Sequence, residues 1–369
     1  MKYLEIFSAI DCIIFNFIPT FNLPTVTQNQ WNTLLEVLNG KEIAPLPVGF
    51  IIDSPWLPNW YGVSILDYFT NDDIWLRANL HVSECFPDIM FLPGFWSEYG
   101  MCSEPSAFGA RCSFPVNEFP HAYPSIFSPE EISRIHEPDP EKDGLAPFIL
   151  NRLLLNKQKI EDHGHQIYFS VSRGPLNIAS YLMGTTEFLT AMITHPDEIH
   201  QLLDVITRYL VKWHRIQKEA FPSIDGILIL DDIIGFIGTD DFKAFGLPLF
   251  KELYNTEVAV KFLHNDASYV SSINFLNDMG VNLFNMGFDA DLELLKEQTG
   301  NRITMLGNIP PRDVLARGTE KEIEKEVMVR VDKMKSKDRM IMSCGGGMPP
   351  EVTTENVSFF ADMVKKYTQ

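Results

Sequence analysis

Short runs of apolar residues recur along the chain and alternate with stretches of helical periodicity. Eight such runs are typical of buried parallel strands; they cover residues 48–52, 89–92, 167–171, 226–230, 258–262, 281–284, 303–306 and 340–343. A helix start follows the third run, where His195 precedes Pro196, Asp197 and Glu198, and apolar residues then recur at helical spacing. Strands that alternate with helices predict a parallel sheet, and eight units predict a closed (β/α)8 TIM barrel.

The domain organisation follows from the same pattern. We expect one barrel over residues 30–369, an N-terminal extension over residues 1–29, and a long Pro- and Ser-rich insertion after the second strand. An open doubly wound sheet is the alternative, but no Gly-rich dinucleotide fingerprint follows the first strand. The apolar extension contains Glu5 and Asp11 and has neither a basic n-region nor a small-residue cleavage site. We therefore expect neither a signal peptide nor a membrane anchor. It is either a packed extension or an arm that covers a second subunit of a homodimer.

Charge and cysteine content narrow the function classes. The chain has a net charge of −19 and an isoelectric point near 4.8. Nucleic acid and anionic membranes are therefore poor partners, because both require clustered Lys and Arg. An acidic surface could still dock a partner protein. Five cysteines without a CxxC pair indicate a reduced, cytoplasmic protein.

Polar residues follow five successive predicted strands, where barrel enzymes carry their catalytic groups. They are Asp231 and Asp232, then His264 to Asp266, then Asn285, Asn308 and Cys344. We predict that Asp232, His264, Asn308 and Cys344 lie on one rim of the barrel. If these residues served only the hydrophobic core, polar side chains would not be expected at the ends of five successive strands. The three glycines after Cys344 allow close backbone approach, for an anion, a cofactor or simply a sharp turn.

Three of these side chains can bind a metal. The imidazole of His264, the carboxylate of Asp266 and the thiolate of Cys344 are all zinc ligands. The alternative is a hydrogen-bonded His264 and an inert, buried Cys344. Of the adjacent acids Asp231 and Asp232, one can face the cavity while the other caps the next helix, or both can be caps or loop acids.

An aromatic group follows the first two strands and indicates a substrate pocket. Aromatic side chains here could sandwich an aromatic substrate or enclose a quaternary ammonium; they could equally serve the core or a subunit contact. Glu98 and Glu104 in the insertion could orient polar substituents. The predicted substrate-binding residues are Trp56, Trp60, Tyr61, Trp96, Tyr99, Glu98, Glu104 and Asn308.

Three segments resemble the uroporphyrinogen decarboxylase superfamily. They are Arg173-Gly174-Pro175-Leu176 with the stretch that continues to His195-Pro196-Asp197, then Leu306-Gly307-Asn308-Ile309-Pro310-Pro311, and Cys344-Gly345-Gly346-Gly347-Met348-Pro349-Pro350. The resemblance covers roughly residues 30 to 367. It implies either the decarboxylase itself or a zinc methyltransferase that works with a corrinoid protein. The decarboxylase holds its substrate with an arginine-rich segment, whereas residues 45–53 here contain no arginine, which disfavours a substrate with eight carboxylates.

The resemblance therefore implies a zinc-dependent methyltransferase. Its family pattern places a His-x-Cys pair and a later Cys on zinc, so it implies His264 and Cys344 as ligands, with Asp266 where the first Cys would stand. Asp232 or Asp231 could replace or supplement Asp266, and we count His264, Cys344 and Asp232 as the catalytic candidates. A carboxylate in place of a thiolate hardens the metal, which favours a methyl donor with an oxygen or nitrogen leaving atom. The aromatic group fits a methoxylated aromatic donor. The methyl group would pass to a cob(I)alamin on a corrinoid protein. The alternatives are a decarboxylase of a smaller substrate and a non-catalytic barrel that binds a corrinoid protein.

Overall fold

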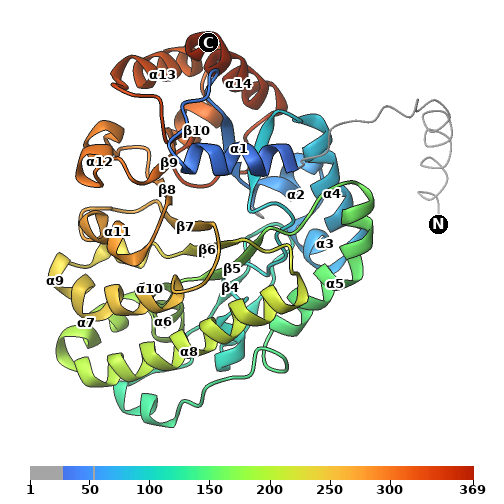
Figure 1. The fold of residues 1–369 in the computed structure, drawn as a ribbon. Helices are drawn as coiled ribbons and strands as arrows, with labels where there is room; N and C mark the ends of the chain where they lie inside the picture. Colours follow the sequence, from blue (N-terminus) through green and yellow to red (C-terminus); the bar gives the residue numbers. More distant parts are fainter. Residues whose placement is uncertain (1–27, 53–54) are drawn as a thin grey trace, which may run out of the picture.

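Eight parallel strands form the centre of the molecule in a computed structural model that describes residues 28–52 and 55–369. Figure 1 shows the strands enclosed by helices, with the last two helices beside the chain's C-terminus. The strands are β1 (Val48–Ile51), β2 (Ile89–Leu92), β5 (Phe169–Arg173), β6 (Gly226–Leu230), β7 (Val260–Asn265), β8 (Leu283–Met286), β9 (Thr304–Ile309) and β10 (Met340–Cys344). The predicted TIM-barrel fold class is confirmed. The expected extension lies almost wholly outside the described residues.

The sheet has the order β2-β1-β10-β9-β8-β7-β6-β5, with every neighbouring pair parallel. Parallel pairing brings all carboxyl ends of the strands to the same rim. Hydrogen bonding continues past the apolar runs, since Leu230 is in register with His264 and His264 with Asn285. His264 is therefore part of β7, not of the loop that we expected to carry it.

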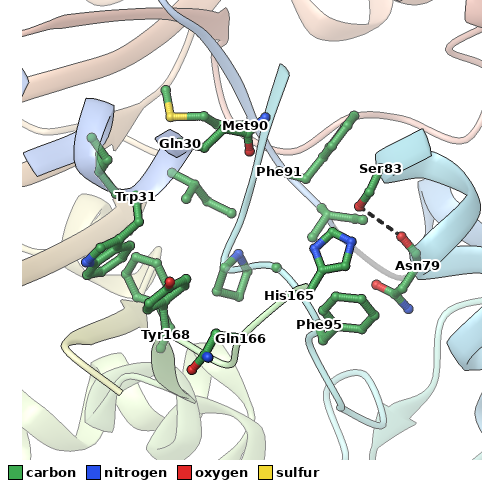
Figure 2. Close-up of a pocket in the computed structure, with 16 residues that line it drawn as sticks. Gln30, Trp31, Asn79, Ser83, Met90, Phe91, Phe95, His165, Gln166 and Tyr168 are labelled. Carbon is green, nitrogen blue, oxygen red and sulfur yellow. Dashed lines mark hydrogen bonds between the residues drawn. The ribbon is translucent and has the colours of Figure 1, made fainter. Parts of the chain in front are cut away.

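The barrel has a seam between β2 and β5, because no strand pairing joins these two within the described ranges. The (β/α)8 fold class holds, but strand pairing among the described residues does not close the barrel at this point. Side chains fill the seam in place of a ladder: Trp31 of α1 (Gln28–Leu38) stacks on Tyr168 at 4.4 Å between ring centroids. Figure 2 shows the small cavity that remains there, of about 50 Å³, with His165 beside Phe95.

Helices alternate with the strands around the barrel. Thr319 and Glu322 form a capping box at the start of α13 (Glu320–Lys333). The long helix α8 begins at Pro196, as predicted, and buries one apolar face from Ile199 to Trp213. After α1 the helices are α2 (Trp56–Tyr61), α3 (Ile65–Thr70), α4 (Asp72–Cys85), α5 (Ala146–Asp162), α6 (Pro175–Met183), α7 (Thr185–Thr194), α8 (Pro196–Ala220), α9 (Thr239–Asp241), α10 (Leu247–Leu253), α11 (Leu276–Met279), α12 (Leu292–Gln298), α13 (Glu320–Lys333) and α14 (Thr354–Thr368).

The insertion between β2 and α5 contains short 3-10 turns and a small hairpin of β3 (Cys112–Ser113) and β4 (His121–Ala122). The backbone N–H of Met101 donates to the carbonyl of Pro120 at 3.1 Å, so the first loop of the insertion is tied to the hairpin. Glu98 and Glu104 of the insertion bond to Arg173, the last residue of β5, so the insertion lies at the rim where β5 ends. A search of the described helices finds none that could span a membrane.

Candidate metal and substrate site

The two adjacent acids after β6 have separate roles. Asp231 is fully buried, and its Oδ2 accepts the backbone N–H groups of Leu176 and Asn177 at 2.9 and 3.2 Å. Burial raises the pKa of this carboxyl to about 8. One of the two predicted roles was that one of the adjacent acids caps the next helix. Asp231 does cap a helix, but this helix is α6, which follows the neighbouring strand β5 and not β6. Asp232 instead faces a cavity.

His264 is held in one orientation by Asn285. The Nδ2 of Asn285 donates to the carbonyls of Leu306 and Cys344 at 2.7 and 3.4 Å. The amide oxygen of Asn285 therefore faces the imidazole, whose Nδ1 lies 2.8 Å away and must carry the proton. Since Nδ1 is the donor, the lone pair of Nε2 is available as a metal ligand. That nitrogen lies 3.7 Å from Oδ1 of Asp232.

Asp266 completes a cluster of three possible ligands. One ligand atom each from Asp232, His264 and Asp266 lies within 4.8 Å of the other two. The backbone N–H of Asp266 donates to Oδ1 of Asp232 at 3.1 Å. Burial raises the pKa of Asp232, while His264 opposes that shift. A nitrogen and two carboxylates so close together suit a divalent cation.

The glycines after Cys344 make room for this cluster. Gly346 has a φ of +86°, and a Cβ there would lie 2.8 Å from Oδ2 of Asp266. A Cβ on Gly345 would lie 2.3 Å from the backbone nitrogen of Phe288. Close packing of three rim loops therefore requires glycine at both positions.

Cys344 lies at the same rim but outside the cluster. Its side chain is buried, and its Sγ donates to the carbonyl of Gly346 at 3.4 Å. The structure thus brings His264, Asp232 and Asp266 together and places the Cys344 thiol in the adjoining loop. Asp232, His264, Asn308 and Cys344 do share one rim, as predicted, because all four lie at the carboxyl ends of parallel strands or directly after them.

The cluster opens into a cavity of about 320 Å³, a size suited to a small molecule. Its walls combine apolar and charged side chains from the strand ends, the insertion and the loop after β10. The described residues that line it are Ile51, Pro55, Trp96, Glu98, Met101, Phe119, Arg173, Asn177, Tyr181, Leu230, Asp232, His264, Asp266, Pro311, Arg312, Gly347, Met348 and Pro349.

A buried ion-pair group forms another part of the wall. Nη2 of Arg173 donates to Oε2 of Glu98 at 2.9 Å, and the Arg173 backbone N–H donates to Oε1 of Glu104 at 3.0 Å. Burial raises the pKa of Glu104. Burial also raises the pKa of Tyr181 to about 12, and this phenol interacts electrostatically with both Arg173 and Asp232. Tyr181 therefore stays protonated between the ion pair and the metal-competent cluster.

Trp96 and Glu98 are the predicted substrate-binding residues that line this cavity. Glu104 lies behind Arg173, where it is 4% exposed. The amide of Asn308 donates to the carbonyls of Gly287 and Ala290 at 3.2 and 2.8 Å. Asn308 thus fastens the loop after β8 and does not reach the cavity.

The other predicted aromatic residues also lie elsewhere. The indole nitrogens of Trp56 and Trp60 donate to Val352 and Thr354, so α2 packs against the start of α14. Tyr61 packs edge-on against His81 of α4, and Tyr99 accepts a hydrogen bond from Arg152. Helix α2 turns Trp56, Trp60 and Tyr61 toward its neighbouring helices, and Tyr99 of the insertion faces α5, so these four residues fit the core alternative.

The strand-end rule found Asn285 but did not predict its contact with His264. Arg173 and Tyr181 are the site residues to which the sequence pattern assigned no role. Arg173 ends β5 after an apolar run, so the strand-end rule that found His264 also applies to it. Tyr181 carries no such signal, because it lies in the apolar helix α6.

Comparisons with known proteins agree with this fold. The family model described as uroporphyrinogen decarboxylase (URO-D) matches residues 29–367. Similar curated proteins include the uroporphyrinogen decarboxylase of Chloroherpeton thalassium, 24% identical over 71% of this chain and 76% of that protein. That of Pseudoalteromonas atlantica is 24% identical over 79% of this chain and 80% of that protein.

Two solved structures share the architecture at low sequence identity. A methyltransferase from Methanosarcina mazei aligns with a TM-score of 0.76 and 20% identity, over 94% of this chain and 99% of that one. A B12-independent methionine synthase from Shewanella sp. W3-18-1, in complex with selenomethionine, aligns with a TM-score of 0.58 and 10% identity, over 87% and 98% of the two chains.

Proposed function

Because the chain belongs to the uroporphyrinogen decarboxylase (URO-D) family, we propose that it is a metal-dependent methyltransferase of that family. The methyl group would move from a small donor, with methoxylated aromatics as the preferred class, to the cob(I)alamin of a corrinoid protein. The observation that carries this proposal is the cluster of Asp232, His264 and Asp266 on a small-molecule cavity. The methyltransferase from Methanosarcina mazei, a solved structure of similar fold, supports the methyltransferase activity.

The donor set of this cluster fits zinc. Catalytic zinc is commonly held by imidazole nitrogen and carboxylate oxygen, with one position left for water or substrate. Asn285 fixes the tautomer of His264 that such a site requires. Cys344 remains a predicted further ligand, since its loop contacts Asp266 through Gly346.

When bound, the ion would supply Lewis-acid stabilisation of the charge on the heteroatom that loses the methyl group. The chain's own residues bind and orient the donor. Trp96, Phe119 and Met348 offer apolar surface for an aromatic ring. Glu98 and Arg173 offer polar contacts on the same cavity. The phenol of Tyr181 holds its proton beside Asp232, so it can donate a hydrogen bond to a bound oxygen.

The charges along the cavity disfavour porphyrinogen decarboxylation. Glu98, Asp232 and Asp266 are three acids on its lining, Arg173 is paired with Glu98, and Arg312 is paired with Asp313. A substrate with many carboxylates would lose its hydration without gaining unpaired cations, and that is costly.

The proposal is tested by incubating zinc-loaded protein with 2-methoxyphenol and cob(I)alamin under anaerobic conditions. We expect the absorbance of methylcobalamin to appear, and to fail to appear with metal-stripped protein or with His264→Ala. Circular dichroism should show the same fold for that variant, because a metal at the rim is not needed for the core. Equal rates for loaded and stripped protein would contradict the proposal, and carbon dioxide release from a small carboxylated substrate would establish the decarboxylase alternative instead.

A further inference from the structure

Arg173 is a cation almost enclosed by acids. Its side chain is 8% exposed, its Nη2 donates to Glu98, and its Nη1 lies 3.6 Å from Oε2 of Glu104. Both glutamates are themselves at least nine-tenths buried. We call Arg173, Glu98 and Glu104 the arginine group. It lines and backs the same cavity as the metal-competent cluster.

The arginine group offers no net positive charge. One guanidinium faces two carboxyls, and burial raises the pKa of Glu104. If Glu104 is ionised the group carries one negative charge, and if Glu104 is protonated the group is neutral. In neither state is there a surplus cation to pair with an anionic ligand.

The same group still offers hydrogen-bond donors. A guanidinium carries five N–H bonds. Within the described part of the chain, the Arg173 side chain makes one hydrogen bond of normal length, to Glu98. The 3.6 Å separation from Glu104 is too long for a good hydrogen bond. A buried arginine on a cavity wall with N–H groups to spare is suited to an oxygen acceptor on a ligand.

We propose that Arg173 recognises an uncharged oxygen of the methyl donor, and that the cavity selects donors without a carboxylate. The inference rests on the proposed function and names its substrate class: a methoxylated arene with a second, neutral oxygen, such as a methoxyphenol. A carboxylate would lose its hydration beside a wall of zero or negative charge. A hydroxyl or ether oxygen loses far less and gains the Arg173 hydrogen bond.

Equilibrium binding tests this directly. Isothermal titration of metal-stripped protein with 2-methoxyphenol and with 3-methoxybenzoate at pH 7 compares a neutral and an anionic donor of similar size. We expect the phenol to bind at least tenfold more tightly. Equal or tighter binding of the benzoate would overturn the proposal. Because no turnover is measured, this result is independent of whether methyl transfer occurs.

Variants locate the effect in the arginine group. Glu98→Gln removes one negative charge beside Arg173, so the affinity for the benzoate should rise about tenfold relative to the affinity for the phenol. Arg173→Gln should weaken phenol binding at least tenfold. The control is Arg312→Gln, which removes an exposed cation at the cavity mouth and should preserve the preference for the phenol.

Two outcomes would contradict the assignment to Arg173. One is a folded Arg173→Gln protein that binds 2-methoxyphenol as the unaltered chain does. The other is a Glu98→Gln protein whose affinity for the benzoate does not rise relative to the affinity for the phenol. If Arg173→Gln does not fold, the Glu98→Gln result and the comparison of the two ligands decide the matter.

Discussion

The hydrogen bond between Asn285 and His264 gives the candidate site its metal-binding tautomer. Asn285→Leu removes the acceptor for Nδ1–H, so His264 can rotate or carry its proton on Nε2. Loss of such a supporting contact commonly weakens metal binding by about 10- to 100-fold. We expect a drop of that size in zinc affinity, measured by competition with a chelating dye. Asn255→Leu in an exposed turn is the control and should bind zinc normally.

His214 makes stability depend on pH. It is buried between Ser170 and Ser172, with its ring nitrogens 2.9 Å from each hydroxyl, and burial lowers its pKa to about 3. Between pH 6.5 and 3 the unfolded chain binds a proton that the folded chain does not. The free energy of unfolding therefore falls as the pH falls, by about 2 kcal/mol between pH 6.5 and 5 from this group.

Urea unfolding at pH 7 and pH 5 checks this sign. His214→Gln should be less stable at pH 7 yet lose less stability on acidification than the unaltered chain. His163→Gln, at the exposed end of α5, should show the original pH dependence. An unchanged pH dependence in His214→Gln would refute the assignment.

Single residues also show what the sequence could and could not predict. The strand-end rule found Asp232, His264 and Asp266, because a polar residue after an apolar run has few other reasons to be there. Which of two adjacent acids faces the cavity depends on β6 and α6 together, and no local pattern contains that. Cys344 satisfies the same rule, but its thiol points to Gly346, and rotamer and loop geometry decide such a contact.

At the scale of elements, the strands were predictable and their ends were not. The apolar runs placed all eight strands, yet β7 and β9 each extend three residues beyond the predicted end. The run of apolar residues stops before the polar side chains of His264 and Asn308, but the hydrogen bonds between the strands continue through both residues. The prediction that the aromatic residues form the substrate pocket was wrong for most of them, because the pattern did not reveal the direction of their side chains. One short helix, α2, turns Trp56 and Trp60 away from the rim.

Two tryptophan variants test whether the insertion, and not α2, supplies the aromatic wall of the cavity. Trp96 lines the cavity, whereas Trp60 on α2 bonds to Thr354 and stacks on Trp56. Trp96→Ala should raise the dissociation constant of 2-methoxyphenol about tenfold, because it removes apolar contact area. Trp60→Ala should leave that constant unchanged but lower the free energy of unfolding by about 1–3 kcal/mol.

Calorimetric binding and urea unfolding of both variants separate the two roles. If Trp60→Ala binds 2-methoxyphenol more weakly without a change in stability, Trp60 lines the substrate pocket and the assignment of α2 to the core is wrong. The same loss of affinity in both variants would indicate an indirect effect through the insertion.

At the scale of the whole molecule, the barrel explains why residues distant in sequence form one site. Eight parallel strands deliver Arg173, Asp232, His264 and the loop after Cys344 to a single rim, and the insertion covers it with Trp96 and Glu98. The alternation of strands and helices predicted this convergence. The unpaired seam between β2 and β5 was not predictable, because both strands have the same apolar pattern as their paired neighbours.

The most direct test of the central claim is the zinc content of the purified chain, measured by elemental analysis after dialysis against a trace of zinc. We predict close to one ion per chain for the unaltered protein and for the Trp60→Ala control. We predict a large loss for His264→Ala and for the pair Asp232→Ala with Asp266→Ala. A chain that retains no zinc, or a His264→Ala variant that retains all of it, would contradict a metal centre at this rim.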